Sequence, residues 1–119
     1  MAGRVVHFEI GAADVDRAQS FYSGVFGWEI GASQMPDFDY RMFQTSENDG
    51  GAIAPGDDRG NFRIYLDTDD IDASVAKVTE LGGTATEKTS VPGHGWMAHC
   101  TDTEGNSFSL WQGDSSVGA

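Results

Sequence analysis

Apolar and polar residues alternate near the start of the chain and then change to a helical spacing. The alternation over residues 4–10 predicts a strand that is buried on one face. Asp14 has the side chain of a helix N-cap, and apolar residues recur after it at intervals of three or four until Gly27. We expect the remaining strands of this half over residues 28–32, 39–45 and 52–54.

The same order of patterns returns after a hydrophilic segment, residues 55–60, which is the predicted linker. A strand is predicted over 61–67, and Asp70 is a second N-cap, 56 residues after the first at position 14. The helix after it is expected to stop at Gly82-Gly83. The last strands are predicted over 84–91, 96–101 and 107–112. The chain therefore contains an internal repeat of one strand, one helix and three strands.

This repeat predicts an α+β fold in which two βαβββ modules face their curved mixed sheets together and enclose a cavity. Module one covers about residues 1–54 and module two about 61–112. We expect one domain over 1–113, because 119 residues suffice for one domain and not for two. Residues 113–119 are expected to be a frayed tail.

Composition and charge exclude several classes of partner. A net charge of −12 repels phosphate backbones and anionic lipids, so we expect no nucleic acid or membrane partner. No apolar run approaches the roughly 20 residues of a membrane span, and residues 1–7 carry no signal-peptide core. Cys100 is the only cysteine, which excludes an intrachain disulfide and a cysteine-based zinc site. We expect a cytoplasmic protein, whose acidity is that of an ordinary bacterial protein or of a high-salt cytoplasm.

Four motifs follow one another along the chain. They are His7-Phe8-Glu9-Ile10, Asp14-Val15-Asp16-Arg17-Ala18, Asp69-Asp70-Ile71-Asp72 and Thr101-Asp102-Thr103-Glu104-Gly105-Asn106. In this order and spacing the chain resembles the vicinal oxygen chelate superfamily, which includes glyoxalase I, extradiol dioxygenases, fosfomycin resistance enzymes and bleomycin-binding resistance proteins. The resemblance implies paired βαβββ modules, a glyoxalase-like fold and a homodimer.

The resemblance also implies where metal ligands would lie, on the first and last strands of each module. His7 matches the first of these positions. Arg63 and Ser109 occupy positions where the family has a ligand, and residues 51–53 offer no ligating side chain at the remaining one. One ligand does not hold a divalent ion that needs three or four, so we expect no metal cofactor.

Strand alternation gives an independent view of the cavity wall. Where apolar residues face the helices, the intervening residues face the opposite, concave side. These intervening residues are polar or aromatic, as a small-molecule pocket requires. The predicted ligand-binding residues are His7, Glu9, Arg63, Tyr65, Ser109 and Trp111, joined by His99, whose face is ambiguous. Each also has a structural interpretation, such as an ion pair between Glu9 and Arg63.

We hypothesise that the protein binds a small organic molecule without a metal in the cavity between the modules, like the bleomycin resistance proteins. The alternative is a metal-dependent lyase or dioxygenase of the glyoxalase type, with His7, Glu9 and His99 as ligands. A third hypothesis is a metal-free isomerase or epimerase that uses Glu9 or His7 as its base. No catalytic residue is assigned.

Overall fold

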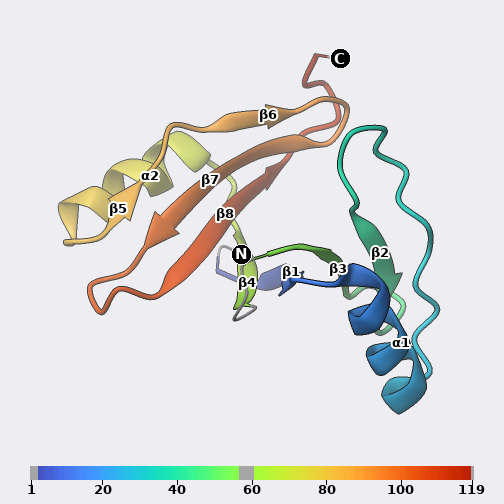
Figure 1. Cartoon of the computed structure of the whole chain (residues 1–119). Coiled ribbons are helices and arrows are strands. Elements are labelled where there is room, and N and C mark those ends of the chain that lie inside the picture. Colours follow the sequence, from blue (N-terminus) through green and yellow to red (C-terminus); the bar gives the residue numbers. More distant parts are fainter. Residues whose placement is uncertain (1–2, 57–60, 119) are drawn as a thin grey trace. The chain divides into compact units, whose positions relative to one another are not determined.

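The computed structural model describes residues 3–56 and 61–118, and Figure 1 labels its elements. The predicted α+β class is confirmed, with parallel and antiparallel strands and two helices in the described residues. The elements are β1 (Val5–Ala12), α1 (Val15–Phe26), β2 (Arg41–Gln44), β3 (Gly50–Pro55), β4 (Asn61–Asp67), α2 (Ile71–Glu80), β5 (Thr84–Ala85), β6 (Thr89–Val91), β7 (Gly95–Thr101) and β8 (Ser107–Gly113).

The chain divides into two compact units. The N-terminal unit is His7–Arg63, and the C-terminal unit combines the described parts of residues 1–6 and 64–119. The first residues join the C-terminal unit because Gly3 N–H donates to the Asp67 carbonyl and Asp67 N–H donates to the Arg4 carbonyl. Of the predicted linker 55–60, residues 57–60 lie outside the described part of the chain.

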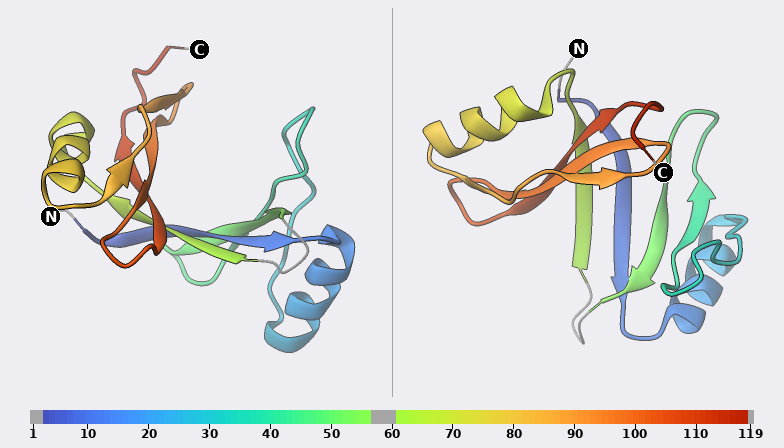
Figure 2. Two further views of the ribbon diagram at one scale, coloured as in Figure 1. Left: turned by 60° about the vertical axis from the view of Figure 1, so that its left-hand side comes forward. Right: turned by 90° about the horizontal axis from the view of Figure 1, so that it is seen from above.

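The N-terminal unit has the strand order β2-β3-β1, and α1 packs on β3 (Figure 2). β1 pairs with β3 in parallel from Phe8↔Gly51 onward, and β2 pairs with β3 in antiparallel. The core consists of buried residues from all these elements, with partly buried aromatic residues packed around it. Its buried members are Ile10, Ala12, Val15, Phe43 and Ile53.

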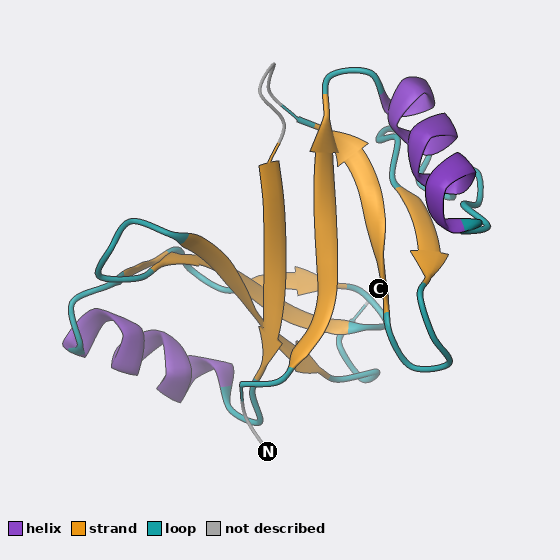
Figure 3. Cartoon of the chain, turned by 90° about the horizontal axis from the view of Figure 1, so that it is seen from below, coloured by secondary structure: helices purple, strands orange, loops and turns teal. Residues whose placement is uncertain are grey.

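The C-terminal unit has the strand order β4-β8-β7-β5, with β6 paired to β7. α2 lies along the β7–β8 ribbon, which Figure 3 shows from below. The core beneath the helix is formed by Ile71, Ala98, Cys100 and Leu110. Cys100 is thus a buried small side chain in the core.

Both helices begin where their capping residues predict. Asp14 accepts a hydrogen bond from the Arg17 N–H at 3.0 Å, and Asp70 accepts one from the Ala73 N–H at 3.1 Å. α1 ends at Gly27, whose φ of 72° is the left-handed conformation that glycine adopts without strain. Both predicted N-caps are therefore present, and the two helices begin at the predicted positions.

Two expectations about the strands need correction. Residues 28–32 form no strand, and one backbone bond, from Gly31 N–H to the Met42 carbonyl, ties this segment to β2. The predicted strand over 84–91 is two short strands, β5 and β6. In the segment expected to be a tail, Val117 is buried and its carbonyl accepts a hydrogen bond from the Gly93 N–H.

The absence of a strand at 28–32 has a physical cause in side-chain packing. The ring of Trp28 stacks on Phe43 at 4.4 Å and on Tyr22 at 5.5 Å, measured between ring centroids. These contacts fix the segment through its aromatic side chain, so it stays near β2 without a continuous ladder of backbone hydrogen bonds.

We predict opposite effects for two glycine-to-alanine substitutions in the N-terminal unit. A Cβ at Gly51 would meet the Phe8 carbonyl oxygen across the β1–β3 pair, so Gly51→Ala should destabilise the protein by about 1–3 kcal/mol. Gly24 lies in α1 with open space around it, so Gly24→Ala should stabilise by about 0.5–1 kcal/mol. Urea unfolding of both variants measures the difference, and equal stabilities would contradict the register of β1 on β3.

Candidate functional site

A chain of hydrogen bonds joins three polar side chains of the N-terminal unit, which we call the His7–Tyr40–Glu9 trio. The Tyr40 hydroxyl donates to Glu9 Oε2 at 2.7 Å. His7 Nε2 lies 2.7 Å from the same hydroxyl oxygen. Because a phenol has one proton and Tyr40 gives it to the carboxylate, His7 is the donor in the other bond. This assigns the proton of the neutral imidazole to Nε2.

The alternation of β1 places the two outer members of the trio on one face. His7 and Glu9 are two residues apart, while Phe8 and Ile10 between and after them pack into the core. The sequence predicts that His7 and Glu9 share a face, and in the structure the Tyr40 hydroxyl links them. Tyr40 was not among the predicted site residues, because it lies 31 residues from Glu9 and no local pattern marks it.

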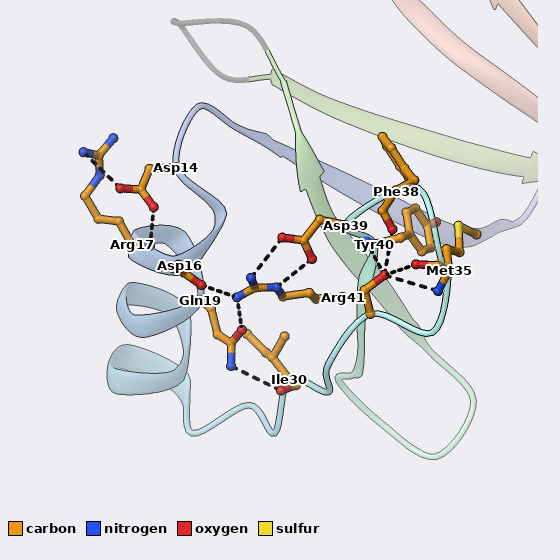
Figure 4. A network of polar contacts seen from close by, with 11 residues as sticks. Asp14, Asp16, Arg17, Gln19, Ile30, Met35, Phe38, Asp39, Tyr40 and Arg41 are labelled. Atoms are coloured by element: carbon orange, nitrogen blue, oxygen red, sulfur yellow. Dashed lines mark hydrogen bonds and ion pairs between the residues drawn. The ribbon is translucent and has the colours of Figure 1, made fainter.

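Ser33 holds the loop that carries Tyr40. Its hydroxyl oxygen accepts hydrogen bonds from the N–H groups of Tyr40 at 3.0 Å and Met35 at 3.3 Å. The hydroxyl also donates to the Phe38 carbonyl at 2.7 Å. Figure 4 shows Met35, Phe38 and Tyr40 gathered around these bonds. One short side chain thus closes the loop just before β2.

Arg41, the next residue, ties β2 to α1 and to the loop. Its guanidinium binds Asp39 in a two-pronged contact, with both N–O distances 2.9 Å. It also contacts Asp16 Oδ1 at 2.8 Å and Gln19 Oε1 at 2.7 Å, both on α1 (Figure 4). Gln19 in turn donates to the Ile30 carbonyl at 3.3 Å. The hydrogen bonds to Asp39 and then Asp16 raise the pKa of Arg41 above its ordinary value, so the cation is permanent.

Burial decides the charge state of His7. Removal from water lowers the pKa of its imidazole below the ordinary 6.5, and the attraction of Glu9 offsets this only in part. His7 is therefore neutral near pH 7, in agreement with its role as a donor to Tyr40 through Nε2. The trio combines one carboxylate, one phenol and one uncharged imidazole.

The other predicted residues lie mainly in the C-terminal unit, where three of them form a row across the sheet. Tyr65 pairs with Ser109 between β4 and β8, and Ser109 pairs with His99 between β8 and β7. His99 Nδ1 lies 2.7 Å from the Ser109 hydroxyl, and both Ser109 and Tyr65 are buried. This register resolves the face of His99, which was ambiguous in the sequence.

The seven predicted residues thus fall into two groups, which belong to different units. His7, Glu9 and the partly buried Arg63 belong to the N-terminal unit. Trp111 follows the C-terminal row by two residues and pairs with Met97. That the seven residues bind a ligand stays a prediction.

Within residues 3–56 and 61–118, no three His, Cys, Asp or Glu side chains are grouped so that they could hold a metal ion. No helix in the described residues has the length and apolar character needed to cross a membrane.

A family model described as a glyoxalase-like domain matches residues 6–111. The chain is 29% identical to the anthracycline biosynthesis protein DnrV of Streptomyces peucetius, over 92% of this chain and 47% of that protein. It is 30% identical to a putative glyoxylase of Mycobacterium bovis, over 93% of this chain and 46% of that protein. It is also 33% identical to a glyoxylase-like domain-containing protein of Didymella fabae, over 68% of this chain and 70% of that protein. The chain spans about half the length of the first two relatives.

Solved structures agree on the fold. Methylmalonyl-CoA epimerase from Mycobacterium tuberculosis superposes with a TM-score of 0.70 at 15% identity, covering 94% of this chain and 88% of that one. A hypothetical protein from Bacillus halodurans gives a TM-score of 0.73 at 11% identity, covering 98% and 99%. At these identities the likeness concerns the fold alone, and the vicinal oxygen chelate resemblance predicted it.

We predict that His7 titrates below 6.5 in an NMR titration of its ring protons, because burial disfavours the imidazolium. The folded protein then takes up this proton at a lower pH than the unfolded chain, so the contribution of His7 to stability is full above 6.5 and is lost as the pH falls toward the folded pKa. Glu9→Gln should lower the midpoint further, since it removes an attraction that raises the pKa. The exposed Glu47→Gln variant is the control, and a midpoint at or above 6.5 would show that burial does not dominate the pKa of His7.

We also predict that Arg41→Lys destabilises the protein, because an ammonium cannot reproduce the two-pronged contact with Asp39. Arg17→Lys is the matched control. Arg17 is 77% exposed and lies 3.8 Å from Asp14, so its replacement should change stability by less than about 0.5 kcal/mol. Urea unfolding compares the two variants, and similar losses would show that Arg41 does not anchor the loop.

Proposed function

The chain belongs to the glyoxalase-like domain family, and from that premise we propose that it binds a small organic molecule, without a metal, at the His7–Tyr40–Glu9 trio. The observation that carries this proposal is the pair of 2.7 Å hydrogen bonds that orient the Tyr40 hydroxyl between an imidazole and a carboxylate. Ligand sites combine such oriented polar groups with apolar surroundings.

The loop beside the trio supplies the apolar surroundings. The ring of Phe38 stacks on Tyr40 with centroids 6.1 Å apart and is 47% exposed. Met35, on the same loop, is 48% exposed. Exposed apolar side chains that lie together next to fixed polar groups are typical of a binding surface.

The negative charge of the protein favours a ligand that carries a positive charge. Glu9 is an acceptor in the trio, and the net charge of −12 attracts cations to the surface. One relative, of which this chain covers about half, is named an anthracycline biosynthesis protein. We therefore propose a flat aromatic compound that carries an ammonium group, with its ring against Phe38 and its charge toward Glu9.

A metal-dependent lyase of the glyoxalase type is the second candidate. The observation that favours it is the relative named a putative glyoxylase. Metal analysis of protein purified without chelator, together with turnover of the methylglyoxal–glutathione hemithioacetal, tests it. Stoichiometric divalent metal and turnover would replace the binding proposal by this one.

We predict that an anthracycline binds the protein and that Glu9→Gln weakens this binding about tenfold, as loss of one charge-assisted hydrogen bond would. Calorimetric titration measures the affinity. Glu47→Gln is the matched control, because it removes the same charge from an exposed position. Equal affinities of the two variants would place the ligand elsewhere, and no binding by the unaltered protein at millimolar concentration would end the proposal.

A further inference from the structure

A pocket lies in the N-terminal unit, against the face of β1 that carries Ile10 and Ala12. Because strand residues alternate, this face is opposite to the one that carries His7 and Glu9. The pocket has a volume of about 360 Å³. Its lining residues come from the end of β1, from α1 and from the start of β4, and they are Ile10, Ala12, Ala18, Tyr22, Asn61 and Phe62, with the backbone of Gly11.

Small residues at the joint between β1 and α1 create this space. Ala12 lies at the end of the strand and Ala18 on the first turns of the helix, where larger side chains would fill the gap. Figure 3 shows the end of β1 leading directly into α1. Ile10 and Ala12 are buried, so the floor of the pocket is apolar.

Two aromatic rings form the walls, and one of them is held rigidly. Tyr22 stacks on Trp28, with ring centroids 5.5 Å apart and planes at 5°, and on Phe26, with ring centroids 6.3 Å apart and planes at 21°. These stacks prevent Tyr22 from turning into the pocket and closing it. Phe62 is 65% exposed, so the pocket opens to solvent beside an aromatic ring.

One polar group of the pocket is the side-chain amide of Asn61. It lies directly over Gly11, since a Cβ at that position would be 2.6 Å from Asn61 Oδ1. Glycine therefore allows this amide to approach β1. An amide offers one acceptor and two donor protons, and none of the described lining residues is charged.

We propose that this pocket is a second binding site, for a flat, uncharged molecule of one or two aromatic rings with a single hydroxyl or N–H substituent. Its volume is at the lower end of the about 300–1,000 Å³ of ligand pockets, which fits a naphthol or an indole rather than a larger compound. The ring lies between Tyr22 and Phe62, and the substituent bonds to the amide of Asn61. The site is independent of the His7–Tyr40–Glu9 trio.

The test is an NMR titration of the whole protein with 2-naphthol. The signals of Ala18, Tyr22 and Phe62 are expected to shift. Ala18→Leu fills the pocket and should weaken binding about tenfold or more, since the ring loses its contacts with the floor. Ala76→Leu, the same change at an exposed position of α2, is the matched control and should bind as the unaltered protein does.

Two further variants make each outcome decisive. Asn61→Ala leaves the apolar floor intact and should weaken binding about three- to tenfold through loss of one hydrogen bond, which keeps the test valid if Ala18→Leu does not fold. Glu9→Gln should bind 2-naphthol unchanged, which separates this site from the trio. The proposal is overturned if the shifts map to Phe38 and Tyr40, if both leucine variants bind alike, or if Asn61→Ala has no effect.

Discussion

The register of β1 on β3 is the constraint on which the rest of the N-terminal unit depends. Pairing of Phe8 with Gly51 and of Ile10 with Ile53 directs the apolar residues of β1 toward α1. His7 and Glu9 then have only the other face available, and a slip by one residue would bury both in the core. Because Gly51 has no side chain, the Phe8 carbonyl can approach it closely, and the two strands can lie in this register.

Side-chain contacts, rather than a sheet, organise the long segment between α1 and β2. Trp28 anchors its beginning by stacking on Phe43, and Ser33 closes its end around Tyr40. Arg41 then fastens the base of the loop to Asp16 of the helix. The position of Tyr40 therefore depends on an ion cluster next to it in the sequence, while its partners lie on a strand more than thirty residues earlier.

The sequence predicted those features that depend on neighbouring residues. Asp14 and Asp70 cap the two helices, and β4 spans the predicted residues 61–67, because caps and alternation are local signals. The sequence did not predict Tyr40 as a site residue, because only the tertiary fold brings it to β1. The segment 28–32 has strand-forming residues, but stacking of Trp28 determines its conformation instead. Alternation along β8 predicted the face of the sheet on which Ser109 lies. That His99 pairs with Ser109 could be seen only from the register of β7 on β8.

The turn after β8 has a practical consequence for handling this protein. Asp114 N–H donates to the His94 carbonyl and Gly93 N–H to the Val117 carbonyl, so the segment is fastened to the turn between β6 and β7. Val117 is as buried as the alanine that ends β1. Ending the chain at the last residue of β8 would remove the buried side chain of Val117 and expose the turn between β6 and β7. An affinity tag is better joined beyond residue 118 than in place of these residues.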